Sequence, residues 1–243
     1  MKLDRVVMTG ADDTVKPEDL IALSQEFPFS EFGILSGGPD YGSSRFPSVA
    51  WIEHLSDLVE DMPEASRPNL CAHLCGKYVK WLFAGETHPD HIFQRSQINT
   101  HGFPMHLMEG YENFKSNLIT AKTHWPGQFI FQCDGENDAI VKEWVAEGLG
   151  VPLFDTSSGA GVLPSYFGES WPKAWDGTYC GYAGGLGPEN VVEQVTGSIK
   201  QAVGAGTIWI DMESRLYSNR IFDLGKCRQV LEAMKPFIGV NLG

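Results

Sequence analysis

The chain has 243 residues, of which 42% are hydrophobic, and its 31 acidic residues outnumber its 18 basic residues, giving a formal charge of −13. This balance argues against a nucleic-acid-binding protein, which would present a basic face. It leaves room for a phosphorylated small molecule, since a few backbone N–H groups and one arginine suffice to bind a phosphate. The hydrophobic content is ample for a buried core.

Eight short apolar runs, rich in β-branched residues, recur along the chain, and most of them are followed by a turn signal and a helical pattern. The predicted strands are 5–10, 31–37, 69–76, 96–101, 128–134, 151–156, 178–183 and 207–212. Three of the predicted helices begin near Pro17, near Ser48 and at Pro188. The helix near Ser48 is expected to turn Val49, Ile52, Leu55 and Val59 inward. The other predicted helices cover 78–84, 111–122, 137–149 and 223–237.

Eight strand–helix units predict an α/β protein with a parallel sheet, namely a single-domain (β/α)8 barrel over residues 1–243. No linker, low-complexity run or break in composition divides the chain. An open, doubly wound sheet is the alternative, but no nucleotide-binding fingerprint follows the first predicted strand.

The cellular setting follows from what the sequence lacks. No run of about 18 apolar residues is present, so we expect no membrane-spanning helix. Residues 1–7 lack the apolar stretch of a signal peptide. The five cysteines are odd in number and lie mostly in apolar runs, which favours reduced thiols in a cytoplasmic protein. They are Cys71, Cys75, Cys133, Cys180 and Cys227.

The segment Gly181–Val191 is typical of a strand end, a glycine turn and the start of a helix at Pro188, with Glu189 in its first turn. Glycines at such a turn let backbone N–H groups approach a ligand, and the helix N-terminus adds partial positive charge. A phosphate is the usual occupant. The alternative is that Gly184 and Gly185 only form a tight turn.

In a barrel of this kind the active site lies at the carboxyl ends of the strands. Nearly every predicted strand ends on polar residues, which favours an enzyme over a plain core. These candidates are Thr9, Ser36, Arg45, His73, Cys75, Asn99, His101, Gln132, Asp134, Asp155, Tyr182, Asp211 and Glu213. Asp155 ends an apolar strand, and a carboxyl group partly shielded from water is suited to act as a general acid.

Two other functions stay open on the residues alone. His73, His101, Asp134, Asp155 and Asp211 are able to supply a divalent-metal site, because strand ends converge in a barrel. No local motif fixes that geometry, and we expect no metal or other cofactor. The second alternative is a catalytically silent barrel that binds a metabolite.

In its order of motifs the chain resembles the phosphoribosylanthranilate isomerase family. Residues 183–191, Ala-Gly-Gly-Leu-Gly-Pro-Glu-Asn-Val, are close to the family's Gly-Gly-Leu-x-Pro-Glu-Asn-Val and carry the most specific part of the resemblance. The other matching segments are 8–10, 42–48, 100–102, 154–156, 158–161 and 210–214.

The resemblance implies an Amadori rearrangement, in which an aminoaldose phosphate becomes an aminoketose. By position it makes Asp155 the general acid, and it places Arg45 on the substrate's carboxylate through a two-pronged contact. It places His101 in the substrate pocket and backbone N–H groups of Gly184, Gly185 and Ser214 on the phosphate.

Two departures from the family pattern affect the expected chemistry. Thr9 stands where the family has its general-base cysteine, and a hydroxyl is too weakly acidic to act as a base unaided. Cys75 or Asp211 would have to replace it. The phosphate-side Ser-Ser-Gly becomes Glu213-Ser214-Arg215, which brings a carboxylate to that end, with Arg215 able to offset it.

The expected partner is an anionic, phosphorylated small molecule, with no nucleic acid and no membrane, and the protein is expected to be a monomer or homodimer. The loop 157–177 holds four large aromatic residues, Tyr166, Phe167, Trp171 and Trp175. They would form a lid over the substrate, a dimer contact, or packing within the loop itself.

Overall fold

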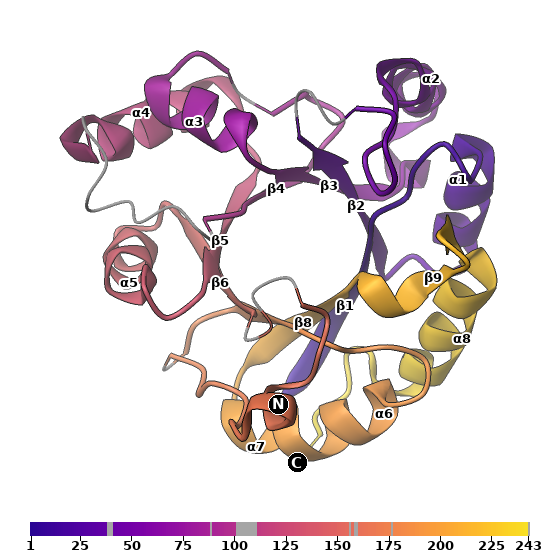
Figure 1. Cartoon of the computed structure of the whole chain (residues 1–243), viewed down its shortest axis with the longest axis vertical. Coiled ribbons are helices and arrows are strands. Elements are labelled where there is room, and N and C mark those ends of the chain that lie inside the picture. Colours follow the sequence, from indigo (N-terminus) through magenta and orange to yellow (C-terminus); the bar gives the residue numbers. More distant parts are fainter. Residues whose placement is uncertain are drawn as a thin grey trace.

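The computed structural model describes residues 1–37, 41–87, 89–100, 111–155, 157, 160–175 and 177–242. Eight parallel strands close into a barrel in the order β1-β2-β3-β4-β5-β6-β7-β8, with helices around the outside (Figure 1). The predicted (β/α)8 fold is therefore confirmed. The strands are β1 (Lys2–Thr9), β2 (Ser30–Ser36), β3 (Asn69–Leu74), β4 (Arg95–Ile98), β5 (Gln128–Cys133), β6 (Gly150–Asp155), β7 (Cys180–Ala183) and β8 (Thr207–Met212).

The helices follow the strands in alternation. They are α1 (Pro17–Glu26), α2 (Val49–Glu60), α3 (Lys77–Ala84), α4 (Tyr111–His124), α5 (Asp138–Ala146), α6 (Val191–Gln194), α7 (Lys200–Val203) and α8 (Leu224–Met234). A π-helical segment, η4 (Val195–Ile199), joins α6 to α7 without a break. After β8 a short 3-10 turn, η5 (Ser214–Leu216), leads into a small antiparallel pair, β9 (Tyr217–Ser218) and β10 (Ile221–Phe222), that the sequence pattern does not predict.

Two details of the predicted helices were wrong. On α2 the inward face includes Trp51, Leu55 and Val59, whereas Val49 is 51% exposed, because the helix starts at Val49 with Ser48 as its N-cap. The helix after β7 begins at Val191 rather than at Pro188. The Asn190 side chain accepts from Gly187 N and donates to Gly185 O, so residues 187–190 form a capped turn instead.

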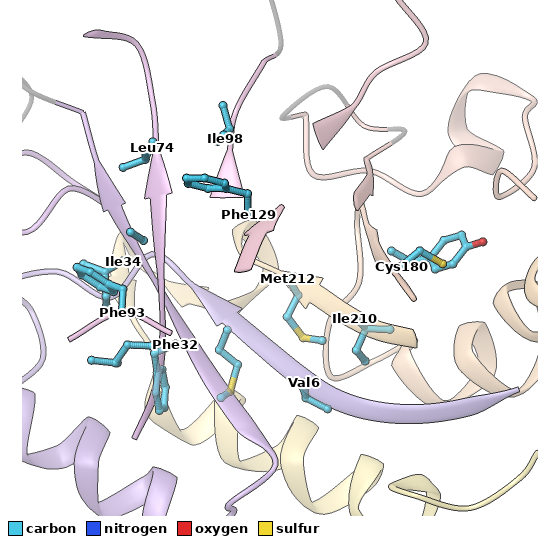
Figure 2. Close-up of a cluster of buried hydrophobic side chains, with 14 of the residues drawn as sticks. Val6, Phe32, Ile34, Leu74, Phe93, Ile98, Phe129, Cys180, Ile210 and Met212 are labelled. Carbon is cyan, nitrogen blue, oxygen red and sulfur yellow. The ribbon is translucent and has the colours of Figure 1, made fainter. Parts of the chain in front are cut away.

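The strand side chains alternate between two environments, as the period of two requires. One set packs outward against the helices, and Figure 2 shows Val6, Phe32, Ile34 and Ile210 among this set. The other set fills the barrel interior, where a small buried cluster comprises Val7, Cys71, Ile130, Leu153 and Trp209. The interior is therefore a packed core, and the space for a site lies beyond it, at the carboxyl ends of the strands.

A buried ionic layer lies toward the amino ends of the strands, at the opposite end of the barrel from the space for a site. Glu31, which is fully buried, forms ion pairs with Arg5 and with Arg95, whose Nη2 lies 3.0 Å from Glu31 Oε1. The Arg95 guanidinium also lies over the Trp209 ring, 4.3 Å from its centroid. Gly181 makes room for that indole, because a Cβ there would lie 2.2 Å from Trp209.

Among the described residues, no helix is long and apolar enough to cross a membrane.

Replacing Arg95 with Met should lower the free energy of unfolding by about 3 kcal/mol, because it leaves Glu31 buried with half of its ionic partners. Urea denaturation of the variant measures the loss. Lys115→Met is the matched control, because Lys115 pairs with Glu143 and Glu147 on the exposed surface and such pairs contribute little. An equal effect of the two substitutions would contradict a structural role for the ionic layer.

Candidate active site

A cavity of about 280 Å³ opens at the carboxyl end of the barrel. Every strand contributes to its lining, which makes it the site expected for this fold. The contributing strand residues include Thr9, Leu35, His73, Gln97, Gln132, Asp155, Ala183 and Asp211. Loop residues complete the wall, among them Arg45, Ser157, Gly161, Gly184, Gly185 and Glu213.

Three buried side chains make the floor of the cavity. The Thr9 hydroxyl donates to Asp211 Oδ1 at 2.8 Å, and Asp211 Oδ2 lies 3.7 Å from His73 Nε2. Gly33 on β2 is necessary for this arrangement, because a Cβ there would lie 2.3 Å from Thr9 Oγ1 and 2.7 Å from His73 Nε2. Thr9 and Asp211, both predicted site residues, are thus brought into direct contact.

Burial shifts both titratable groups of this floor toward their neutral forms. It raises the pKa of Asp211 well above its ordinary value, and the Thr9 hydrogen bond opposes that rise only in part. Burial, reinforced by the charge of Arg95, lowers the pKa of His73 to about 3. His73 is therefore neutral at physiological pH, and its contact with Asp211 is not an ion pair there.

Asp155 is held in a fixed orientation at the end of β6. Its Oδ2 accepts from Gln132 Nε2 at 2.8 Å, and its Oδ1 accepts from Ser157 through both the backbone N–H, at 3.0 Å, and the hydroxyl, at 2.7 Å. The side chain is half-buried and lines the cavity. A carboxylate fixed this way presents its free lone pairs in a defined direction, which proton transfer requires.

A chain of polar side chains runs along the β3–β4 wall. Gln97 Nε2 donates to Asn99 Oδ1 at 2.7 Å, and Asn99 Nδ2 donates to Cys75 Sγ at 2.9 Å. Gln97 was not among the residues predicted for the site. The signal that finds it is the alternation along β4, which places Arg95, Gln97 and Asn99 on the inner face.

Arg45 reaches the cavity from the loop after β2 and meets Glu213. Its Nε lies 2.7 Å from Glu213 Oε1. The φ of Arg45 is 75°, in the left-handed region that favours glycine. Its backbone N–H donates to Asp12 Oδ2 at 2.8 Å, and this hydrogen bond holds the turn in that conformation. Burial raises the pKa of Glu213, Arg45 lowers it, and Asp155 raises it.

The glycine stretch lies where the sequence predicts. Gly184 and Gly185 both line the cavity and have positive φ values of 121° and 66°. A side chain at Gly185 is excluded, because a Cβ would lie 2.4 Å from the backbone of Val162 and Leu163. Among the described residues, no backbone carbonyl accepts a hydrogen bond from the N–H of Gly184 or Gly185.

The segment after β8 is divided between the cavity and the surface. Ser214 lines the cavity beside Gly161, where a Cβ would lie 1.9 Å from Ser214 Oγ. Arg215 forms an ion pair with Glu189 and is not among the described residues of the lining. His101, the remaining predicted binding residue, lies outside the described residues.

Two further strand-end candidates face away from the cavity. The Tyr182 hydroxyl donates to Pro172 O, and its ring packs against Trp171 and Phe154, because Ala183 rather than Tyr182 faces the interior. Asp134 accepts from the N–H groups of Glu136 and Asn137 in the turn before α5. Across the described part of the chain, no group of three His, Cys, Asp or Glu side chains converges as a metal site would.

The aromatic residues of the β6–β7 loop fall into two pairs. Trp171 is 6% exposed and Trp175 packs edge-on against Phe154, so these two form packing within the loop. Tyr166 and Phe167 stack edge to face and are 75% and 52% exposed. The predicted lid or dimer contact therefore rests on Tyr166 and Phe167.

Comparisons with known proteins give the fold. No protein-family model matches the chain, and no curated protein matches it. Among solved structures, the chain is similar to N-(5′-phosphoribosyl)anthranilate isomerase from Pyrococcus furiosus, with a TM-score of 0.55, 14% identity, and 96% of this chain and 99% of that chain covered.

Two other similar structures have different activities. One is phospho-2-dehydro-3-deoxyheptonate aldolase from Thermotoga maritima, at TM-score 0.51 and 12% identity, with 96% of this chain and 69% of that chain covered. The other is a GH113 β-1,4-mannanase, at TM-score 0.50 and 10% identity, with 96% and 98% covered. An isomerase, an aldolase and a glycosidase share this architecture, so the likeness shows a (β/α)8 barrel and leaves the chemistry to the site.

Gly33→Ala should lower the free energy of unfolding by about 2 kcal/mol, because the added methyl group overlaps Thr9 and His73 in a packed interior. Thermal and urea denaturation measure the change. Gly197→Ala, in the helix after β7, is the control, because nothing lies within 4 Å of its Cβ position. Equal stability of the two variants would contradict the close packing of the floor.

Because of His73, the free energy of unfolding should decrease as the pH is lowered from 6.5 to about 3. In this window the unfolded chain binds a proton that the folded His73 does not, so the slope is about 1.4 kcal/mol per pH unit. His73→Gln should remove this slope, whereas His124→Gln, at an exposed position, should leave it. Asp211 acts in the opposite sense, so the difference between variant and parent is the quantity to compare.

Proposed function

We propose that the protein catalyses an acid–base isomerisation of the aldose–ketose, Amadori-like type on a phosphorylated, sugar-derived small molecule. The observation that carries the proposal is that the carboxyl groups of Asp155 and Glu213 line one cavity, together with the Thr9–Asp211 floor. Two carboxyl groups in unlike environments are the usual means of dividing acid and base roles within one site.

The two environments suggest a division of roles. Glu213, whose pKa burial raises, is suited to donate a proton to the ring oxygen of the sugar. The C1–O bond then breaks as the nitrogen lone pair forms the C1=N bond. Asp155, oriented by Gln132 and Ser157, is suited to remove the proton from C2, which gives the enol form that becomes the ketose. Asp155 thus acts as the general base in this proposal, whereas the family resemblance implies that it is the general acid.

Thr9 takes no direct part in proton removal in this scheme. Its hydroxyl donates to Asp211 and keeps that carboxyl group in place beneath the substrate. Asp211 in turn supplies a second weakly acidic group close to the reacting carbons. The absence of a cysteine at position 9 is therefore compatible with catalysis.

The phosphate would bind at the glycine turn. The N–H groups of Gly184 and Gly185, together with the exposed Ser214 that also lines the cavity, are the supporting features. Paired positive-φ glycines present N–H groups in the manner of anion-binding loops. The five cysteines, all within the described residues, form no disulfide, which supports a reducing compartment, and we propose the cytoplasm.

The test is exchange of the C2 proton in D2O, followed by NMR, for aldose phosphates and their glycosylamines, with phosphoribosylanthranilate turnover followed by fluorescence. Asp155→Asn should reduce the rate on whichever compound reacts by about 10²- to 10⁴-fold. Asp57→Asn, on the exposed face of α2, should leave it unchanged. Full activity of Asp155→Asn, or no exchange with any compound, would refute the proposed reaction.

A further inference from the structure

The charge of the cavity is poorly matched to a substrate that is anionic throughout. The carboxyl groups of Asp155 and Glu213 line it above the buried Asp211, whose neutral form is favoured by burial. Among the lining residues that the structure describes, Arg45 is the one with a permanent positive charge, since His73 is neutral. The wall around the reacting carbons is therefore acidic, even though the glycine turn is suited to a phosphate.

Arg45 is not available to a substrate carboxylate. Its guanidinium is already paired with Glu213 at 2.7 Å, and its backbone is fixed by Asp12. A substrate carboxylate at this position would have to share the guanidinium with Glu213. It would then lie close to a second carboxylate of like charge, which is unfavourable.

Two buried amides point independently to a ligand with hydrogen-bond donors. Gln97 and Gln132 are 6% and 5% exposed, and both line the cavity. Their N–H ends are used by Asn99 and Asp155, whereas Gln97 Oε1 and Gln132 Oε1 accept no hydrogen bond. A buried acceptor without a donor is costly, so both oxygens favour a ligand that brings hydroxyl or amino groups.

We infer that the substrate carries a basic, protonated amine at the acidic wall and hydroxyl groups toward Gln97 and Gln132. This inference rests on the proposed function and narrows its substrate to an aminosugar phosphate whose nitrogen is alkyl-like and whose amino component bears no carboxylate. The acidic wall then serves two purposes. It binds the ammonium group, and the Glu213 carboxylate takes the ammonium proton and passes it to the ring oxygen, which frees the nitrogen lone pair for the C1=N bond while Asp155 remains the base. Glu213 becomes the residue that selects against a carboxylate.

Isothermal titration calorimetry at pH 7 with two probes tests the inference. Glucosamine 6-phosphate and glucose 6-phosphate share the phosphate and the ring and differ in one amino group. The amino compound should bind at least about 10-fold more tightly, which corresponds to one favourable ionic contact of about 1.4 kcal/mol. Glu213→Gln should reduce this preference, and should raise the affinity for 6-phosphogluconate, whose carboxylate then meets an unpaired Arg45.

Glu193→Gln, an exposed substitution on α6, is the control and should change none of these affinities. The parent protein tests the preference without any variant, so a folding defect of Glu213→Gln cannot obscure it. Equal or tighter binding of glucose 6-phosphate would overturn the inference while leaving the proposed reaction standing. Failure to bind either sugar phosphate would overturn the phosphate end of the proposed function and the inference together.

Discussion

The hydrogen bond between Thr9 and Asp211 spans the seam where the first and last strands close the barrel. Val7 on β1 lies in register with Asp211 on β8, and the side chain of Asp211 reaches the interior at the floor of the cavity. Gly33 supplies the space on the neighbouring strand, and His73 fills it from β3. The site therefore rests on a floor assembled from four strands, and its geometry depends on correct closure of the sheet.

The floor also sets the chemistry of what lies above it. Because burial favours the neutral forms of Asp211 and His73, the ionised groups of the cavity are the more exposed ones at its rim, among them the Glu213–Arg45 ion pair. Their exposure to the cavity lets a substrate change their environment on binding. The fold thus separates a neutral polar layer that supports the site from a titratable layer that is suited to react.

The barrel was predictable from the sequence because strand–helix alternation is a local pattern repeated eight times, and no long-range contact had to be guessed. The placement of Thr9, Asp155, Asp211 and the glycine turn followed from the same pattern. Side-chain pairing was not predictable. The ion pairs that occupy Arg45 and Arg215 join residues far apart in the chain, and nothing in the local sequence indicates that Glu213 and Glu189 are their partners.

Errors of one to three residues also arose from contacts that the local sequence does not indicate. Tyr182 and Ala183 are neighbours on β7, and which of them faces the interior depends on the register with β8 rather than on polarity. Similarly, the start of the helix after β7 moved from Pro188 to Val191 because the Asn190 side chain bonds to the glycine turn. Tertiary and side-chain contacts overrode helix-start signals that are sound in isolation.

The π-helical segment η4 shows how this helix tolerates a change in length. An i→i+5 turn holds one more residue than an α-helical turn, so the segment Val195–Ile199 absorbs an extra residue within the helix while α6 and α7 continue on either side. The ends of the connection between β7 and β8 therefore keep their positions. The extra residue stays in the outer ring of helices, and β8 keeps an unbroken register with β7, so the carboxyl groups that β8 and its following loop bring to the cavity keep their positions.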